Sequence, residues 1–268
     1  MIKLICSDID GTLLNANREL SEVSIAKIGK LKNELPFILI SSRMPSAMRH
    51  LQKQLNILDH PFVAYNGGLI HVNNHVVQST TIPFELLKRI VEMNDDRLHL
   101  SLYNNDDWFA PQHDQWSERE MNNTKVNPTF KANDEVLKLW EVNNTGAHKI
   151  MCMGEKEFIT KFYNKLEHQF SNEIHLYRSK DSYIEIAPKQ ISKRSAIEFL
   201  IASEYRLHMS EVMSFGDNYN DIEMLEASGI GIAVGNARDE VKSKADKIIG
   251  DAKEDGVANY LNHYFKTR

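Results

Sequence analysis

The chain of 268 residues is long enough for one large domain or two of ordinary size, so a small fold that depends on disulfides is excluded. Its 32 basic and 37 acidic side chains nearly balance at a formal net charge of −5, which excludes a strong positive field for holding nucleic acid or an anionic membrane. With 42% hydrophobic and 26% charged residues, the composition is typical of a globular protein, and a small molecule is the expected partner.

The cysteine content and the first residues predict a cytoplasmic location. Cys6 and Cys152 are the two cysteines, and they form no cluster suited to zinc or to a set of disulfides, as is typical of a reducing compartment. The chain becomes polar at Ser7, before an apolar run of signal-peptide length. No run of eighteen apolar residues predicts a helix that spans a membrane.

The first third of the sequence alternates strands and helices. Apolar runs and helical spacing predict strands at 3–7, 37–40 and 62–65 and helices at 21–33 and 46–55. This order predicts a parallel sheet with helices on its faces. Because ligands bind beyond the carboxyl ends of such strands, Asp8, Ser41 and Asn66 are expected to meet at one sheet edge.

From about residue 83 the pattern changes to α+β, and after Pro188 the first pattern resumes. The middle block has predicted helices at 84–93, 113–123, 134–141 and 155–169 and strands at 98–103, 108–110, 149–153, 174–178 and 183–187. The last block has predicted helices at 192–204, 222–227 and 240–245 and strands at 212–215, 230–233 and 247–249. We therefore expect a doubly wound, mostly parallel Rossmann-like α/β core, residues 1–82 and 189–268, with an α+β domain inserted at 83–188.

Asp8 and Asp10 follow directly on the first predicted strand. Because side chains alternate along an extended chain, the two carboxylates start on the same face, and such a pair is costly unless a cation joins it. Gly11 allows a sharp turn after them, and Thr12 can bond the turn backbone. Taken alone, the motif is also compatible with a plain acidic turn after a strand.

Asp217 and Asp221 form a second acidic cluster, in the segment 216–221 at the end of another predicted strand. Together with Asp8 and the backbone carbonyl of Asp10, their oxygens predict a site of the kind that Mg²⁺ prefers and zinc does not. The cluster alone is typical of a turn that caps the next helix. Two acidic strand ends in one sheet favour the metal site.

Four segments carry a family resemblance: DIDGTLL at 8–14, ISSR at 40–43, Lys193, and GDNYNDIEML at 216–225. Their order and spacing resemble the four motifs of the haloacid dehalogenase superfamily, and within it the Cof-type phosphatases, over nearly the whole chain. The segments 65–68 and 185–188 extend the likeness. The resemblance implies that the middle block is a large α/β cap, inserted after the third core strand.

The resemblance also implies phosphoryl transfer through a covalent aspartyl phosphate. Asp8 is the implied nucleophile, and Mg²⁺ held by Asp8, Asp10, Asp217 and Asp221 would act with Lys193 to neutralise the phosphate charge. Asp10 is the implied acid and base. For that role it must be protonated part of the time, although a model Asp titrates at about pH 4. Neighbouring carboxylates favour the proton and a metal opposes it, so the sequence leaves its protonation open.

The phosphate cradle implied by the family consists of the Ser41 hydroxyl, the backbone N–H groups of Ile9 and Ser42, the Lys193 ammonium and Asn220. Ser41 stands where the family usually has threonine, which keeps the hydroxyl. Ser42 stands where it usually has glycine, so a backbone with positive φ at this position would be strained.

Contacts to the rest of the substrate are less well defined by the sequence. Arg43 could reach the substrate or fix its own loop, and we favour the loop. The other candidates are Asn66, Gly67, His113, Arg178 and Tyr183. The expected partner is a small phosphorylated metabolite, of the sugar phosphate, pyridoxal phosphate or flavin mononucleotide class, and the expected assembly is a monomer or weak homodimer without nucleic acid or membrane.

Three other functions remain open at this point. A phosphomutase would share the nucleophile but return the phosphoryl group to the substrate, and it would need a bisphosphate activator. A phospho-aspartate signalling module would share the acidic strand ends but needs no inserted domain, and its acyl phosphate would have to persist. A non-catalytic sensor would leave the complete set of motifs unexplained.

Overall fold

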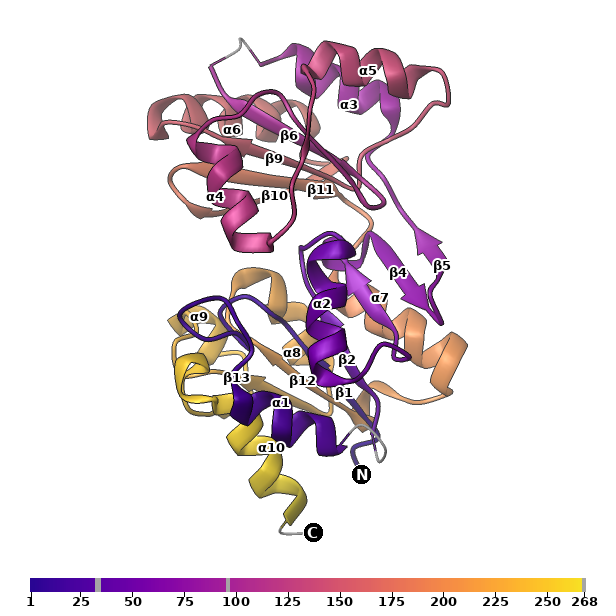
Figure 1. Ribbon diagram of the computed structural model, residues 1–268, viewed down its shortest axis with the longest axis vertical. Coiled ribbons are helices and arrows are strands. Elements are labelled where there is room, and N and C mark those ends of the chain that lie inside the picture. Colours follow the sequence, from indigo (N-terminus) through magenta and orange to yellow (C-terminus); the bar gives the residue numbers. More distant parts are fainter. Residues whose placement is uncertain (32–34, 95–96, 267–268) are drawn as a thin grey trace. The chain divides into compact units, whose positions relative to one another are not determined.

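The computed structural model describes residues 1–31, 35–94 and 97–266, and the chain divides into two compact units. The first unit comprises residues 1–43, 48–78 and 192–268, and the second comprises 44–47 and 79–191. Each unit has its own sheet. The expected fold class, an α/β core with a second unit inserted in its sequence, is therefore confirmed (Figure 1).

The sheet of the first unit contains eight strands among the described residues. In spatial order they are β14 (Lys247–Ile248), β13 (Ile230–Ala233), β12 (Val212–Gly216), β1 (Leu4–Ser7), β2 (Phe37–Ile40), β3 (Phe62–Ala64), β4 (Leu69–Val72) and β5 (His75–Ser79). Neighbours from β14 to β3 pair in parallel, with Leu4 opposite Val212 and Ile5 opposite Phe37, whereas β4 is antiparallel to β3. The central strands are buried throughout, which explains why they are nearly continuous apolar runs.

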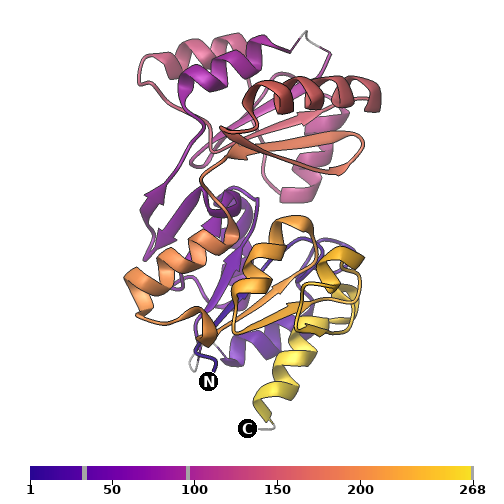
Figure 2. The same ribbon diagram turned by 180° about the vertical axis from the view of Figure 1, so that it is seen from behind.

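Helices cover both faces of this sheet (Figures 1 and 2). On one face lie α1 (Glu22–Leu31), α2 (Ser46–Leu55) and α10 (Gly256–Lys266), and on the other α7 (Lys193–Leu200) and α8 (Ile222–Ala227). The sequence runs from β1 to β2 in one direction and from β12 to β13 in the other, so right-handed crossovers place their helices on opposite faces. The strand order reverses between β1 and β12, and such a switch point is where ligands bind in open α/β sheets.

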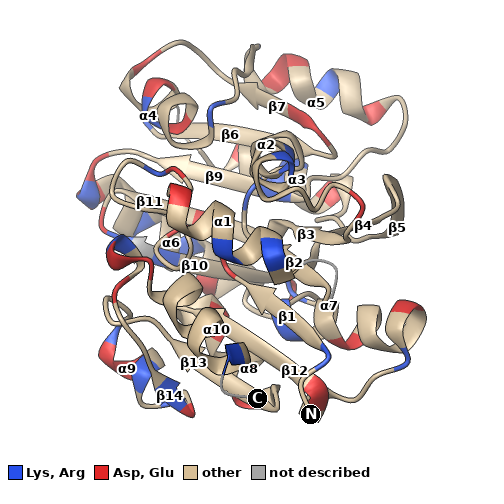
Figure 3. Ribbon diagram, turned by 60° about the horizontal axis from the view of Figure 1, so that its bottom comes forward, with Lys and Arg blue, Asp and Glu red and all other residues tan. Residues whose placement is uncertain are grey.

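Charges of both signs lie along the same elements of this unit. The short helix α9 (Asp239–Lys242) carries Asp239, Glu240 and Lys242, and Lys247 follows in β14 (Figure 3). Among the described residues, no helix is both long and apolar enough to cross a membrane.

The second unit has a mainly antiparallel sheet. Its strands, in spatial order, are β10 (Ile174–Lys180), β11 (Tyr183–Pro188), β9 (Lys149–Met153), β6 (His99–Asn104), β7 (Asp107–Ala110) and β8 (Thr129–Phe130). Helices α3 (Phe84–Glu92), α5 (Asn133–Glu141) and α6 (Lys156–Phe170) pack their apolar faces against one side of it, while α4 (Gln115–Thr124) contributes nothing to that core. This unit matches the α+β pattern expected for the middle of the chain.

Most predicted elements are found within one or two residues of their predicted bounds, but two helices differ. The helix predicted at 192–204 is α-helical only from Lys193 to Leu200 and continues as a π-helical turn, Ile201–Tyr205, which ends where Arg206 adopts φ 53°. The helix predicted at 240–245 is only the four residues of α9. The end of the helix predicted at 21–33 lies outside the described residues. Strands β4, β5 and β8 and helix α10 were not predicted.

Candidate active site

A buried lysine joins two carboxylates at the switch point of the first unit. Asp8 follows β1, and Lys193 is the first residue of α7. The Lys193 Nζ donates to Asp8 Oδ1 at 2.5 Å and to Asp221 Oδ1 at 2.6 Å, and its side chain is fully buried. Ser192 caps α7 reciprocally with Ser195, so the helix starts at the lysine. A cation is unfavourable in the first turn of a helix, which indicates that these carboxylates hold it there.

Three carboxylates lie close together at this point of the site. Asp8, Asp217 and Asp221 each offer an oxygen within 4.8 Å of the others. Asp217 Oδ1 accepts from Thr12 Oγ1 at 2.8 Å, and Asp221 Oδ2 accepts the backbone N–H groups of Asp217 and Asn218. Thr12 therefore bonds a carboxylate of the second cluster and not the turn backbone that the sequence suggested.

The charges of this cluster do not balance. Burial raises the pKa of Asp8 well above its ordinary value, and Lys193 offsets this only in part. Burial, followed by the Asp221 carboxylate, raises the pKa of Asp217 to about 7. Burial lowers the pKa of Lys193, but Asp221 and Asp8 outweigh it and raise the pKa above its usual range. One ammonium thus faces three carboxylates, and these oxygen donors fit a divalent cation.

Two glycines leave room for these carboxylates. Gly11 has φ 88°, and a Cβ at this position would collide with the Asp217 carboxylate. A Cβ on Gly216, the last residue of β12, would collide with Asp221. The Asp217 carboxylate therefore packs directly against the backbone of Gly11, and the Asp221 side chain packs directly against the backbone of Gly216.

Asp10 is held by two arginines. The Arg43 Nε donates to Asp10 Oδ2 at 2.7 Å and its Nη2 to Oδ1 at 2.8 Å, while the Arg18 Nη1 donates to Oδ1 at 3.0 Å. Burial acts to raise the pKa of Asp10, but the bonds and charges of Arg43, and then the charges of Arg18 and Lys193, keep the pKa below its ordinary value. These contacts favour the ionised carboxylate, and Arg43, which lies in the loop after β2, therefore holds Asp10.

The predicted phosphate cradle lies at the same edge. Ser41 is buried directly after β2, and its Oγ accepts the Arg43 N–H at 3.2 Å. Ser42 does not have a positive φ, so the position occupied by glycine in the family does not require one here. The Asn220 Nδ2 donates to Asn66 Oδ1 at 3.0 Å, which joins the acidic loop to the end of β3.

The turn after β3 is tightly constrained. Asn66 has φ 56° and donates its N–H to the Ser41 carbonyl at 2.8 Å. Gly67 has φ 112°, and a Cβ there would lie 2.6 Å from the Ser192 carbonyl oxygen at the start of α7. This turn therefore fixes both Asn220 and the helix that carries Lys193.

The candidates in the second unit have partners within that unit. The Arg178 Nη2 donates to Thr160 Oγ1 at 2.8 Å, and Arg119 lies over the ring of Tyr183 at 5.9 Å. His113 pairs with Glu118 at 3.7 Å. Their contact with a substrate stays a prediction.

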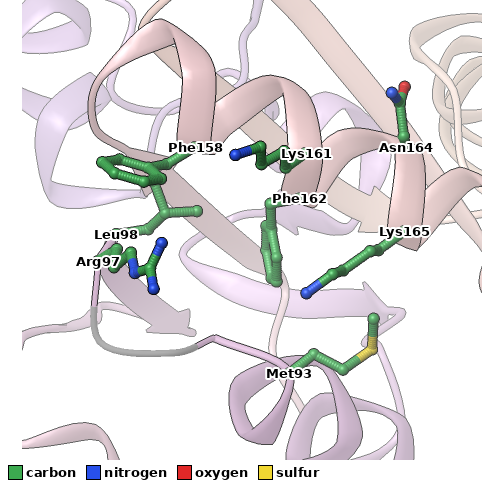
Figure 4. A pocket seen from close by; sticks show the side chains of 8 residues that line it. All are labelled: Met93, Arg97, Leu98, Phe158, Lys161, Phe162, Asn164 and Lys165. Atoms are coloured by element: carbon green, nitrogen blue, oxygen red, sulfur yellow. The ribbon is translucent and has the colours of Figure 1, made fainter.

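The second unit also contains a hollow of about 290 Å³ between α6 and the segment before β6 (Figure 4). Its lining combines apolar and basic side chains: Met93, Arg97, Leu98, Phe158, Lys161, Phe162, Asn164 and Lys165. None of the site residues predicted from the sequence lines it.

Three residues of the site were missed at the sequence level. One is Arg18, and the other two, Asn236 and Arg238, lie in the loop after β13. The Asn236 Nδ2 donates to the Gly11 carbonyl at 2.7 Å, and the backbone N–H of Arg238 donates to the Asp217 carbonyl at 3.1 Å. Arg238 Nε also donates to Asn218 Oδ1 at 3.0 Å. The sequence contained a signal for Asn236 and Arg238, because the loop after β13 starts at the same sheet edge as the loops of Asp8 and Asp217.

Comparisons with known proteins agree with this site. The family model for haloacid dehalogenase-like hydrolases matches residues 5–261, so the chain belongs to that family, and the resemblance inferred from the motifs is confirmed. A Haemophilus influenzae protein that bears a provisional phosphatase name is 32% identical over 99% of both chains. The 5-amino-6-(5-phospho-D-ribitylamino)uracil phosphatase YitU of Bacillus subtilis is 28% identical over 98% of this chain and 97% of its own. The chain is thus an enzyme of the phosphatase type in this family.

The fold comparison leads to the same family. The crystal structure of a haloacid dehalogenase-like hydrolase from Bacteroides thetaiotaomicron matches with a TM-score of 0.89 at 25% identity and covers 99% of this chain and 100% of its own.

Proposed function

We propose that the protein is a Mg²⁺-dependent phosphatase that hydrolyses the phosphomonoester of a small metabolite through an aspartyl phosphate on Asp8. The observation that carries the proposal is the buried Lys193 between Asp8 and Asp221, with a third carboxylate, Asp217, close by. A cluster with this excess of negative charge would bind a phosphate dianion only when a further cation is present.

The donor set suits Mg²⁺. Hard carboxylate oxygens from Asp8, Asp217 and Asp221, with the backbone carbonyl of Asp10, would hold the ion. When bound, Mg²⁺ supplies positive charge that stabilises the phosphate oxygens in the transition state.

Asp8, Asp10 and Lys193 would each have a separate role in the reaction. A carboxylate oxygen of Asp8 attacks phosphorus, and the bond to the ester oxygen breaks. Asp10 would protonate that oxygen, and for this it must first take up a proton, because Arg43 and Arg18 favour its ionised form. Asp10 then takes a proton from the water that hydrolyses the acyl phosphate. Lys193 stabilises the charge on the transferred phosphoryl group throughout.

Four groups would bind and orient the phosphoryl oxygens. The Ser41 hydroxyl, the Asn220 amide and the backbone N–H groups of Ile9 and Ser42 all belong to loops at the same sheet edge. Because these loops are fixed by hydrogen bonds before substrate arrives, little reorganisation is needed in the transition state.

The proposed substrate is a small phosphorylated metabolite of the sugar phosphate, pyridoxal phosphate or flavin mononucleotide class. The name of the Bacillus subtilis relative, which includes a phosphorylated ribityl chain on a uracil ring, supports a substrate of this size. By the same family resemblance, the inserted unit would act as the cap that selects the leaving group, with Arg178 and Tyr183 as candidates.

The test is release of inorganic phosphate from p-nitrophenyl phosphate and from a panel of phosphorylated metabolites. We expect activity that a chelator removes and Mg²⁺ restores. Asp8→Asn should abolish turnover while the circular dichroism spectrum stays unchanged, and acid quenching should trap phosphoprotein only with Asp8 present. Full activity of Asp8→Asn would refute the proposal, and a requirement for a bisphosphate activator would indicate a mutase.

A further inference from the structure

We infer that Arg238 is a positioning residue that holds the acidic loop, residues 217–221, in the geometry that Mg²⁺ requires, and that it thereby favours Mg²⁺ over the larger Ca²⁺. The inference rests on the proposed function, in which Asp217 and Asp221 of this loop help to hold Mg²⁺. Arg238 lies in the loop between β13 and α9, outside all the motifs of the family resemblance. It is therefore a residue to which those motifs assign no role.

Arg238 contacts three successive residues of the acidic loop. Its backbone N–H donates to the Asp217 carbonyl at 3.1 Å, and its Nε donates to Asn218 Oδ1 at 3.0 Å. Its guanidinium carbon lies over the Tyr219 ring, 4.9 Å from the ring centre. Arg238 therefore holds the part of the loop that begins at one proposed metal ligand, Asp217, and leads to the other, Asp221.

Hydrogen bonds within the loop connect these contacts to the carboxylates. Asp221 Oδ2 accepts the backbone N–H groups of Asp217 and Asn218, at 2.9 and 3.0 Å. Asn218 Oδ1 accepts the Tyr219 N–H at 3.0 Å in addition to the bond from Arg238, so both lone pairs of this oxygen are used. A movement of Asn218 would therefore also move one of the N–H groups that hold the Asp221 carboxylate.

The backbone around Arg238 is itself fixed. Asn236, two residues earlier, accepts the Ala252 N–H at 2.8 Å and donates to the Gly11 carbonyl at 2.7 Å. The Arg238 carbonyl accepts the Lys242 N–H at 2.9 Å at the start of α9. The Arg238 side chain makes no capping bond to this helix, so helix formation does not explain an arginine here. Its contacts with the acidic loop do.

Mg²⁺ is more sensitive than Ca²⁺ to the exact position of its ligands. Mg²⁺ needs a nearly ideal octahedron with distances of about 2.0–2.1 Å, whereas Ca²⁺ accepts about six to eight oxygens at about 2.3–2.6 Å in a flexible arrangement. A loop released from Arg238 should therefore lose Mg²⁺ affinity and keep most of its Ca²⁺ affinity. Loss of the positive charge alone would have a different result, because it would strengthen the binding of both cations.

The experiment titrates the metal-free full chain with MgCl₂ and with CaCl₂ in a calorimeter at one pH. Arg238→Met removes the guanidinium, and Arg238→Lys keeps the charge but removes the Nε donor and the planar group over the ring. We expect Arg238→Met to weaken Mg²⁺ binding by roughly threefold to tenfold and Ca²⁺ binding by less than about twofold. Arg238→Lys should show most of the same loss.

Lys244→Met is the control, because Lys244 is 48% exposed and pairs with one carboxylate, Glu226, at 2.9 Å. Its affinities for both ions should equal those of wild type. The ratio of the two affinities does not depend on how much of a variant is folded, so partial unfolding leaves the test valid.

An unchanged ratio in Arg238→Met, tighter binding of both ions, or full recovery in Arg238→Lys would overturn the assignment of Arg238. Failure of the proposed function is a separate result: wild type would then bind no Mg²⁺, or Asp8→Asn would remain active as a phosphatase.

Discussion

Replacement of Lys193 by methionine tests the electrostatic account of the site most directly. The substitution keeps most of the volume of the side chain but removes the ammonium from between Asp8 and Asp221. The side chains of these two carboxylates are 8% and 1% exposed, so water cannot replace the lost partner. Removing one member of a buried ion pair typically costs about 3–5 kcal/mol, which for a unit of this size lowers Tm by roughly 6 to 20 °C.

The loss should depend on pH. In the wild type the pKa of Asp8 is already raised by burial, and removal of the ammonium raises it further. A carboxyl whose pKa is higher in the folded protein stabilises the fold below its unfolded pKa and loses that contribution as pH rises. Thermal unfolding with a chelator should therefore show a larger Tm difference between variant and wild type at pH 8 than at pH 5. Added Mg²⁺ should recover part of the difference at pH 8, since it supplies the missing charge.

Lys3→Met is the matched control, because Lys3 is 54% exposed and pairs with Glu211 at 2.7 Å. Exposed pairs contribute about 0–1 kcal/mol, so its Tm should stay within a few degrees of wild type. A Tm for Lys193→Met equal to that of the control would refute the reasoning. A loss of the same size at pH 5 and pH 8 would also refute it, because lost packing and not unpaired charge would then be the cause.

Three further predictions concern the acidic cluster and the loop after β2. Burial and the Asp221 carboxylate raise the pKa of Asp217 to about 7, so this group should destabilise the metal-free protein as pH rises from about 4 to 7. Mg²⁺ should therefore raise Tm more at pH 8 than at pH 5.5. An equal rise in Tm at the two pH values would contradict this. Gly11 has φ 88°, and the Cβ of an alanine at this position would collide with the Asp217 carboxylate. Gly11→Ala should therefore weaken Mg²⁺ binding by about tenfold in calorimetric titrations. An unchanged affinity would show that the turn relaxes. Ser42→Gly should leave kcat/KM within about threefold, since Ser42 has no positive φ to relieve; a large gain would mean that serine strains the loop.

The strands and helices that the sequence predicts well are those with strong periodicity. Strand β2 and helices α2 and α8 have their predicted bounds, because continuous apolar runs or clear helical spacing end at polar residues. The hairpin of β4 and β5 was missed although its signal is visible: Asn73 and Asn74 both have positive φ, as in a tight two-residue turn. Helix α10 likewise has Val257 and Leu261 at helical spacing.

The site was predictable to the level of its strand-end loops. Because parallel strands end at one edge, Asp8 and Asp217 were expected at the same edge of the sheet, whereas the structure shows that their strands, β1 and β12, are neighbours. The lowered pKa of Asp10 could not follow, since it depends on where the Arg43 guanidinium and then the Arg18 guanidinium lie. The loop that carries Arg18 is formed by side-chain hydrogen bonds of Asn15. Sequence patterns report burial and periodicity, and neither determines such a contact.

The bond between Lys193 and Asp8 joins residues 185 positions apart, and the bond between Thr12 and Asp217 joins residues 205 apart. Pairings within the second unit connect nearer segments, so that unit can fold while the rest of the chain is still being made. Strand β1 can pair early with β2 but must wait for β12 before its other edge is covered. During synthesis this apolar strand therefore stays open on one edge until β12 has emerged, and the acidic cluster can assemble only after the whole second unit has been made.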